Sequence, residues 1–408
     1  MNVLIVDMGS RLNKFGGEER MASLLQKRLK GSFTTFYLGY ETHYTGNGKD
    51  HIILGRGKRI NENIRRNILS ELSPFRVAYY LFYVRNLFGI GMGRGILLER
   101  IRRINPEVII SNSIQDFPII NYLRGKGLDF KTMYIDHGSI STGNTAGYFS
   151  KEGIPMTFGT GINAASFEKA RAEFFRFFNM NIAINLMQFE AISRYTKKVA
   201  YIPNGLDIKA RREPSMERQL RSRFGIKEGD FVVLYVGRLF DRQKNVSTLI
   251  RSFTLIDDPR MKLVVAGEGP SFSEYKALAG DDGRIIFTGR LEEKRLNSIY
   301  NLADLFVLPS VWEGFNLTVL EAAAHSIPIV LSKNAYSQDL RKASGDHIET
   351  FDTFKHEELA RLLDRVRKNK GMRERLRKAS HEINAFFTEE KMLKRYEKEI
   401  RGLAAGKR

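Results

Sequence analysis

The stretch LFVLPSVWEGFNLTVLEAAAHSIPIV, residues 305–330, predicts the fold of the region around it. It begins as a short apolar strand that ends at Pro309, turns at Gly314 and continues into a helix, which a second apolar strand follows. A strand, a helix and another strand in succession are typical of a parallel sheet. The stretch also carries two carboxylates, Glu313 and Glu321, whose role depends on what the rest of the chain places around them.

The same alternation of strands and helices runs along the whole chain. β-Branched runs bounded by Gly, Pro, Asn or Asp predict strands, and helical patterns such as NVSTLIRSFTLI and EEKRLNSIYNLA separate them. The expected strands are NVLIVDMG, SFTTFYLGY, PEVIISNS, FKTMYIDHG, NIAINL and VAYIPNG in the first half, and DFVVLYVGRL, MKLVVAGEGP, RIIFTGRL, ADLFVLPS and IPIVLS in the second. We therefore predict an α/β protein with two Rossmann-like domains, each built on a doubly wound parallel sheet.

The turn-rich stretch YIPNGLDIKARREPS, residues 201–215, separates the two halves and indicates a hinge near 195–210. A chain of 408 residues also exceeds the size at which one hydrophobic core usually stops growing. We expect an N-terminal domain over 1–200, a C-terminal domain over 201–385, and a helix with a tail over 386–408. This last amphipathic helix could return to either domain.

Composition excludes several classes of site and protein. The sequence has no cysteine, which excludes disulfides, thiolate nucleophiles and cysteine-ligated metals. No apolar stretch approaches the about 18 to 20 residues that span a bilayer, and the N-terminus is more typical of a first strand than of a signal peptide. The net charge of +20 indicates a polyanionic neighbour, such as nucleic acid, an acidic membrane or a phosphate-bearing substrate. We therefore expect an unsecreted, cytoplasmic protein.

Arg238 and Lys244 follow the strand FVVLYV and its terminal Gly237. Ligands of open parallel sheets bind outside the carboxyl ends of the strands, so residues that follow a strand are candidates for a site. Two cations beside the N-terminus of the next helix could bind an anion such as a diphosphate, through their charge and the helix dipole. In the alternative interpretation, Arg238 contacts a neighbouring carboxylate and Lys244 is solvated.

Glycines follow two further strands of the second half. Gly267 lies in the tight turn GEGP after MKLVVA, and Gly289 and Arg290 follow RIIF closely. Because glycine has no Cβ, the backbone at such positions can approach a flat ligand. A glycine after a strand more often serves an ordinary turn, so each of these signals needs support from others.

Glu313 and Glu321 flank the start of the helix in the quoted stretch. Gly314 lets the chain turn, and residues 315–317 lead into a helix whose first N–H groups point out of the carboxyl edge of the sheet. Glu321 lies about one and a half turns inside the helix, so both carboxylates can reach the same cleft. A carboxylate accepts two hydroxyl hydrogen bonds, which suits the vicinal diol of a sugar or a ribose. In the alternative interpretation, Glu321 fixes a neighbouring helix and Glu313 is solvated.

Gly16 and Gly17 lie between the first strand and its helix, where a Cβ would block the close approach of a ligand. The G-x-G-x-x-G spacing of a dinucleotide site is absent. His137 follows another strand, in YIDHGS, and is expected at the same edge of the sheet. A lone histidine is usually structural. At the carboxyl end of a strand, however, a functional role and a structural role for His137 are about equally favoured.

In their order along the chain, these motifs resemble the retaining glycosyltransferases of family four, which have the GT-B fold. The resemblance rests on GG near the N-terminus, HG after a middle strand, IPNGLD, VGRLFDRQKN, AGEGP, FTGRL and EGFNLTVLE. It covers nearly the whole chain and is strongest over 201–331. It implies two Rossmann-like domains that face each other across a cleft.

The resemblance implies a role for each candidate residue. Arg238 and Lys244 would hold the diphosphate of the donor, Glu321 the nucleotide ribose, and Glu313 hydroxyls of the transferred sugar, with His137 near the reacting sugar. On this basis the expected catalytic residues are His137, Arg238, Lys244 and Glu313. The resemblance also implies Gly16 and Gly17 near the distal phosphate, Gly289 and Arg290 near the base, and backbone amides of Phe315, Asn316 and Leu317 around the sugar and phosphates. Gly237, Gly267 and Gly314 are expected at the donor as well.

Fixed cations and helix N-termini are suited to stabilise a departing nucleoside diphosphate and an oxocarbenium-like sugar. No metal or other cofactor is then required, and the sequence has no Asp-x-Asp pair that would chelate a divalent ion. The resemblance further implies retention of configuration by front-face attack, in which the leaving phosphate assists deprotonation of the acceptor.

The sequence departs from the family pattern near these motifs. Asn334 and Ala335 stand where glycines are expected, and Ser326 precedes the strand that contains a proline. Asn245 follows Lys244, where a glycine is more frequent. The replacement of glycines by Asn334 and Ala335 bears on how the helix after the strand IPIVLS contacts the donor phosphates.

The acceptor varies within the family with the first domain. Here the stretch 73–103 mixes aromatic residues with Arg76, Arg85 and Arg94, which is typical of a peripheral membrane surface that reaches a lipid-linked acceptor. A buried helix pair that covers the sheet would have similar aromatics. The expected partners are a nucleotide sugar, a glycan, lipid-linked or small-molecule acceptor, and an anionic membrane contacted peripherally at its inner face.

Other functions stay open on the sequence alone. A nucleotide-sugar epimerase with the same fold would interconvert sugars without an acceptor, and a phosphorylase would need a cofactor lysine that we do not identify. The positive charge alone suggests nucleic-acid binding, but no motif of interleaved aromatics and glycines supports it, so no nucleic acid is expected as a partner. The joint presence of Arg238, Lys244, Glu313 and Glu321 disfavours a non-catalytic protein.

Overall fold

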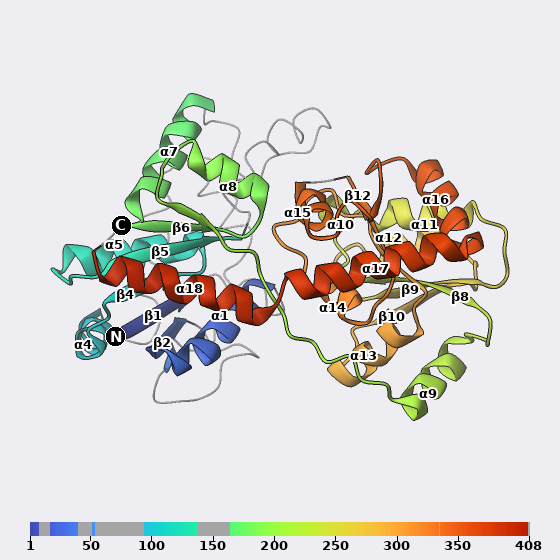
Figure 1. Cartoon of the computed structure of the whole chain (residues 1–408), viewed down its shortest axis with the longest axis horizontal. Helices are drawn as coiled ribbons and strands as arrows, with labels where there is room; N and C mark the ends of the chain where they lie inside the picture. The colour runs from blue at the N-terminus through green and yellow to red at the C-terminus, as the bar shows by residue number, and fades with distance from the viewer. Residues whose placement is uncertain (8–16, 40–50, 54–93, 138–163, 334, 407–408) are drawn as a thin grey trace. The chain divides into compact units, whose positions relative to one another are not determined.

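The structure, a computed structural model, describes residues 1–7, 17–39, 51–53, 94–137, 164–333 and 335–406. The chain divides into two compact units, each of which is described by itself (Figure 1). Unit 1 comprises Met1–Pro203 and Glu390–Arg408, and unit 2 comprises Asn204–Glu389.

Unit 1 contains a parallel sheet of seven strands in the order β3-β2-β1-β4-β5-β6-β7. These strands are β1 (Asn2–Asp7), β2 (Thr34–Gly39), β3 (His51–Ile53), β4 (Val108–Ser111), β5 (Lys131–Asp136), β6 (Met180–Ala183) and β7 (Val199–Tyr201). The helices described in this unit are α1 (Gly17–Arg28), η1 (Leu29–Gly31), α4 (Arg94–Ile104), η2 (Ile114–Asp116), α5 (Phe117–Gly125), α7 (Ala164–Phe177) and α8 (Leu186–Ser193). Strand β4 is buried along its whole length, as expected for a continuous apolar run in a sheet covered on both faces.

Unit 2 contains a second parallel sheet, with six strands in the order β10-β9-β8-β11-β12-β13. Its strands are β8 (Phe231–Val236), β9 (Met261–Ala266), β10 (Ile285–Gly289), β11 (Leu305–Leu308), β12 (Ile329–Ser332) and β13 (Glu349–Phe351). Its helices are α9 (Pro214–Phe224), α10 (Asp241–Lys244), α11 (Val246–Thr254), α12 (Phe272–Ala279), α13 (Glu293–Leu302), α14 (Leu317–Ala324), α15 (Ala335–Ala343), α16 (His356–Lys368) and α17 (Lys370–Phe386).

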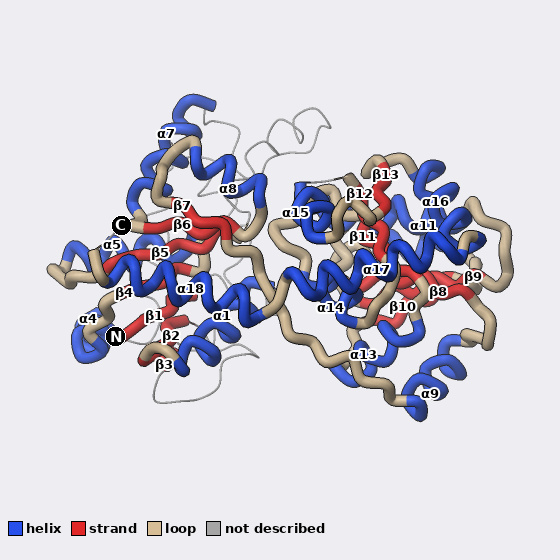
Figure 2. The backbone as a smooth tube through the Cα atoms, viewed as in Figure 1, coloured by secondary structure: helices blue, strands red, loops and turns tan. Residues whose placement is uncertain are grey.

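Helices flank both sheets, as Figure 2 shows for the strands in red and the helices in blue. In unit 2, α11 packs against α12 and α16, whereas α17 packs against α14 and α15. The strand order reverses between β8 and β11, which is the topological switch point of a doubly wound sheet. The loops after β8 and β11 therefore begin at the edge where such sheets bind ligands.

The last helix, α18 (Glu389–Ala404), belongs to unit 1 from Glu390 onward. Its contacts explain this placement, since Ser32 Oγ donates a hydrogen bond to Glu397 Oε1 at 2.7 Å and the guanidinium of Arg401 lies 5.0 Å from the ring centre of Phe33. The buried side chains of α18 follow a helical spacing, with Met392, Tyr396, Ile400 and Leu403. The chain thus enters unit 2 once and returns to unit 1 at its end, one of the two courses that the sequence left open.

All the strands expected from the sequence are present, and so are the two helices quoted with them. The sequence reading missed β3 and β13, each of which has only three residues and lies at an edge of its sheet. A three-residue strand is too short to show the apolar run or alternation that identifies a strand. Asn334 and Ala335 stand where the family pattern has glycines. Ala335 is the first residue of α15, and Asn334 lies outside the described residues.

Candidate functional site

Lys244 and Glu313 meet at the carboxyl edge of the unit 2 sheet. Lys244 ends α10 in the segment after β8, and Glu313 lies in the loop after β11, the strand beside β8. The Nζ atom of Lys244 is 2.7 Å from Oε1 of Glu313, and the two side chains are only 12% and 5% exposed. Two residues predicted separately from the sequence thus form one partly buried ion pair.

Asn316 fixes Glu313 and the start of α14 together. Its Nδ2 donates to Oε1 of Glu313 at 3.0 Å, and its Oδ1 accepts from the backbone N–H of Thr318 at 2.9 Å, which caps the helix. Phe315 packs edge-on against Tyr336 with ring centres 4.8 Å apart. The turn at Gly314 is therefore held by a helix cap on one side and an aromatic contact on the other.

Asn245 holds the end of the Lys244 segment. It adopts a left-handed conformation with φ of 49°, which asparagine tolerates better than most residues. Its Nδ2 donates to the carbonyl oxygens of Pro309 at 3.2 Å and Thr353 at 2.6 Å, and its Oδ1 accepts from Thr248 Oγ1 at 2.8 Å. One buried amide thus connects the segments that follow β8, β11 and β13. From the sequence, this residue stood out only because a glycine is more frequent at its position.

Asp241 is a second supporting residue, which was not predicted from the sequence. Its Oδ1 accepts from the backbone N–H of Ser247 at 3.1 Å and from the hydroxyl of Tyr275 at 2.8 Å, and its Oδ2 accepts from Ser247 Oγ at 2.8 Å. Burial and this carboxylate raise the pKa of Tyr275. Asp241 thereby joins the beginning of α10 to α11 and α12, so both ends of the Lys244 turn are fixed.

Arg238 and Glu321 also lie on elements of unit 2, but their surroundings differ from those of Lys244. Arg238 is exposed, with its guanidinium 5.5 Å from the ring centre of Phe240, and its backbone oxygen accepts from Tyr235 Oη at 3.0 Å. Glu321 is half-buried on α14 and accepts from the hydroxyl of Tyr300 at 2.8 Å. Leu317, the first residue of α14, is buried.

The predicted glycines Gly237, Gly267 and Gly289 lie at the carboxyl ends of three neighbouring strands: Gly237 follows β8, Gly267 follows β9, and Gly289 is the last residue of β10. The backbone N–H of Gly267 donates to Gly289 O at 3.0 Å, and that of Gly237 donates to Ala266 O at 3.0 Å. A Cβ on Gly267 would lie 1.9 Å from Gly237 O. Gly267 must therefore lack a side chain so that the backbone of Gly237 can pack against it, whether or not a ligand also binds there. The backbone N–H of Arg290 lies 3.4 Å from Glu268 Oε1.

In unit 1, His137 pairs with a residue from the neighbouring strand. Its Nε2 is 2.9 Å from Oδ1 of Asn112, which directly follows β4, the strand beside β5. Burial lowers the pKa of His137 to about 4 from 6.5, so the imidazole is neutral at neutral pH. Gly17 begins α1 and is exposed, whereas Gly16 lies outside the described residues.

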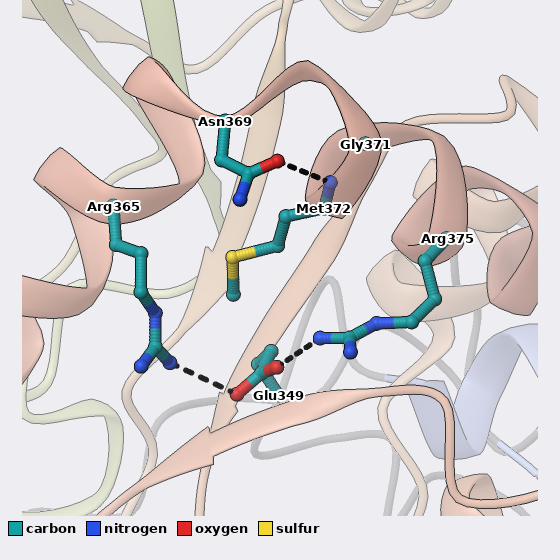
Figure 3. Close-up of a pocket in the computed structure, with 6 residues that line it drawn as sticks. All are labelled: Glu349, Arg365, Asn369, Gly371, Met372 and Arg375. Atoms are coloured by element: carbon teal, nitrogen blue, oxygen red, sulfur yellow. Dashed lines mark hydrogen bonds and ion pairs between the residues drawn. The ribbon is translucent and has the colours of Figure 1, made fainter.

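A pocket of about 540 Å³ lies elsewhere on unit 2, where β13, α16 and α17 meet (Figure 3). Glu349 lies between two arginines there, 3.3 Å from Arg365 and also paired with Arg375. The lining residues are Glu349, Arg365, Asn369, Gly371, Met372 and Arg375, and none of them is a predicted site residue. Because Glu349 pairs with both arginines, this cluster ties an edge strand to two helices.

Comparison with known proteins identifies the class of unit 2. Residues 216–383 match the family model of the glycosyl transferases group 1. Unit 2 is a group 1 glycosyl transferase domain. The ion pair of Lys244 with Glu313, the capping residue Asn316 and Glu321 all lie within the matched range of this glycosyl transferase domain.

Two of the curated relatives match the chain over stretches no longer than one domain. The chain is 30% identical over 162 residues to alpha-monoglucosyldiacylglycerol synthase of Streptococcus pneumoniae, which covers 37% of this chain and 36% of that protein. It is 28% identical over 143 residues to UDP-Gal:alpha-D-GlcNAc-diphosphoundecaprenol alpha-1,3-galactosyltransferase of Escherichia coli, which covers 33% of this chain and 36% of that protein. The matched stretches therefore span about a third of each relative.

Solved structures resemble the chain over nearly its whole length. HepE of Anabaena, solved in complex with UDP, has a TM-score of 0.70 at 14% identity and covers 98% of this chain and 100% of that chain. Sucrose-phosphate synthase of Thermosynechococcus elongatus has a TM-score of 0.73 at 17% identity and covers 100% of both chains. At this level of identity the likeness shows the fold, and it confirms the predicted GT-B fold with its two parallel α/β domains.

Across the described ranges, no cluster of three or more His, Asp or Glu side chains is placed to hold a metal ion. Among the helices that the structure describes, none combines the length and the apolar character needed to cross a bilayer.

Proposed function

We propose that the chain is a retaining glycosyltransferase that moves a hexose-type sugar from a nucleoside-diphosphate sugar to a glycan, lipid-linked or small-molecule acceptor. The observation that carries the proposal is the Lys244–Glu313 ion pair, held by Asn316 at the start of α14 within a group 1 glycosyl transferase domain. A cation and a carboxylate side by side suit a ligand that has a diphosphate next to a sugar.

Each residue of this site has a role in the proposed reaction. An ammonium has three N–H donors, so Lys244 can bind a phosphate oxygen while it stays bonded to Glu313. Arg238, exposed on the preceding loop, adds a second cation for the diphosphate. Glu313 keeps a second carboxylate oxygen for hydroxyls of the transferred sugar, and Glu321 receives those of the ribose.

The chemistry of the step is electrostatic in this proposal. Negative charge develops on the diphosphate as its bond to the sugar breaks, and fixed cations and the N-terminus of α14 stabilise that charge without rearrangement. Lys244 and Arg238 supply the positive charge, so we propose that neither a metal nor another cofactor takes part. Retention of configuration and the contact of His137 with the sugar stay predictions from the sequence resemblance.

The nucleotide site is tested by thermal stabilisation of the purified protein with UDP, GDP and ADP and with their sugar conjugates. We expect one base to raise the melting temperature clearly, equally with magnesium and with EDTA, because a ligand that binds the folded state stabilises it. UDP is a natural first probe, because HepE of Anabaena was solved with it. A failure of every nucleotide to shift the transition under both conditions would remove the proposed donor site.

The acceptor side of the proposal is a lipid-linked or glycan molecule at the cytoplasmic face of a membrane. The names of the relatives mention a glucosyl diacylglycerol and a diphosphoundecaprenol. Within the basic aromatic stretch 73–103, only 94–103 are described. There Ile96 in the first turn of α4 is 54% exposed, and Arg102 and Arg103 lie in its last turn.

We expect weak binding of the protein to anionic vesicles through this stretch, stronger at low salt than at physiological salt, because basic residues near a charged bilayer act electrostatically. Co-sedimentation with vesicles that contain phosphatidylglycerol measures it, and neutral phosphatidylcholine vesicles are the control. No binding to anionic vesicles at low salt would contradict the membrane contact and leave the transferase proposal intact.

A further inference from the structure

Tyr300 bonds directly to the carboxylate of Glu321 from a different helix. Tyr300 lies on α13, is 2% exposed, and donates its hydroxyl hydrogen to Glu321 Oε2 at 2.8 Å. A hydrogen bond from a phenol to an ionised carboxylate is charge-assisted and stronger than a bond between neutral groups. No sequence motif pointed to this residue.

The ring of Tyr300 is itself held in place. It stacks on the imidazole of His325 with centres 5.0 Å apart and planes at 23°. His325 lies one turn after Glu321 and caps the end of α14, with Nδ1 at 2.8 Å from the backbone oxygen of Glu321. The same imidazole therefore contacts both the tyrosine and the residue that the tyrosine binds.

Asn297 closes this arrangement from the side of α13. It lies one turn before Tyr300, and its Oδ1 is 2.9 Å from Nε2 of His325. The backbone of Arg211 fixes the orientation of this amide, because Arg211 O accepts from Asn297 Nδ2 at 2.5 Å and the N–H of Arg211 donates to Oδ1 at 3.3 Å. The Tyr300 hydroxyl thus points at Glu321 from a scaffold that is bonded on both sides.

We propose that Tyr300 is a positioning residue for the donor nucleotide: its hydroxyl holds the Glu321 carboxylate in the orientation that receives the two ribose hydroxyls. This inference rests on the proposed function, in which Glu321 binds the ribose. A glutamate side chain has three rotatable bonds, and fixing it before the ligand arrives lowers the entropy lost on binding. Tyr300 itself stays in the packed interface between α13 and α14 and does not touch the ligand.

The test is calorimetric binding of the nucleoside diphosphate that the wild type binds, chosen from UDP, GDP and ADP. Tyr300→Phe removes one oxygen and keeps the ring, and we expect Kd to rise about tenfold, the usual effect of losing a hydrogen bond to a charged group. With the 2′,3′-dideoxy form of the same nucleotide, the variant and the wild type should differ by less than about twofold, because no diol is present for Glu321 to bind.

Two controls separate positioning from packing. Tyr396→Phe alters another fully buried tyrosine, on α18 in unit 1, and should leave Kd unchanged. In a Glu321→Ala background, Tyr300→Phe should add nothing to Kd, because the two residues act as one unit.

The outcomes distinguish this inference from the function on which it rests. An unchanged Kd in Tyr300→Phe, with normal binding by the wild type, overturns the inference and leaves the proposed function standing. Equal losses with the ribose and the dideoxy nucleotide also overturn it, since they indicate a general disturbance of the domain. A wild type that binds none of the three nucleotides removes the proposed function, and the inference with it.

Discussion

Replacing Lys244 with alanine should lower the rate of sugar transfer by about 100-fold or more, which is the usual effect of removing one fixed group that stabilises charge in the transition state. Lys244 is suited to that role because it is held rather than mobile. Its ammonium is bonded to Glu313 at 2.7 Å, and the backbone on either side of it is tied down by Asp241 and Asn245. A cation in a fixed position does not need to reorganise as charge develops on the diphosphate.

The measurement is turnover with donor and acceptor at saturating concentrations, compared with Lys368→Ala as a matched control. Lys368 also pairs with a carboxylate, Asp364 at 2.6 Å, but it is 63% exposed on α16. An exposed ion pair contributes only about 0 to 1 kcal/mol to stability, so its loss should disturb the fold little. We therefore expect the rate of transfer by this control to stay within about twofold of the wild type. Near-wild-type turnover in Lys244→Ala would remove Lys244 from the mechanism.

A loss of stability accompanies this variant and has to be separated from the loss of rate. Glu313 is 5% exposed, and removing one partner of a buried pair typically costs about 3 to 5 kcal/mol. Transfer should therefore be measured well below the melting temperature of the variant. The double variant Lys244→Ala with Glu313→Gln removes the unpaired charge, so it should recover part of the stability without recovering the rate. A recovered rate would mean that Lys244 acts only through the fold.

The sequence predicted the two sheets and most of the residues at the site, because both are local patterns. Each strand is a short apolar run of its own, and most candidate residues lie in the segments that connect a strand to the next helix. The bond between Lys244 and Glu313 was not predicted, since the two positions are 69 residues apart and meet only because β8 and β11 are neighbours in the sheet. The sequence therefore singled out Lys244 and Glu313 separately but did not predict the contact between them.

The supporting residues were missed for a different physical reason. Asn245 stands where a glycine is more frequent, and its backbone has a positive φ, which glycine and asparagine tolerate better than other residues. Its further role comes from its side chain, which bonds to carbonyl oxygens 64 and 108 residues away. Tyr300 belongs to no motif, and its bond to Glu321 depends on how α13 packs beside α14. Contacts of this kind depend on packing between elements, to which periodicity and spacing are insensitive.

Gly267→Ala should destabilise unit 2 by about 3 kcal/mol or more, the second large effect that the structure predicts. Gly267 has φ of 144°, which side-chain-bearing residues rarely adopt, and a Cβ there would lie 1.9 Å from the backbone oxygen of Gly237. The obstructing atom belongs to backbone that is itself bonded to β9, since the N–H of Gly237 donates to Ala266 O. The clash can be relieved only if the loops after β8 and β9 move apart, and the first of these loops leads to Lys244.

The single tryptophan of the chain, Trp312, lies in the loop after β11, so its fluorescence during denaturant unfolding reports on unit 2. Gly283→Ala is the control for the substitution itself, because nothing lies within 4 Å of a Cβ there and no positive φ is required. Gly280→Ala controls for backbone strain, because its φ is 55° and its Cβ would meet open space, so we expect about 1 kcal/mol. A Gly267→Ala midpoint close to that of Gly280→Ala would show that the loops yield easily, which would contradict a rigid support for Lys244. A much lower midpoint would instead show that the glycine is required by the chain's own backbone, independently of any nucleotide.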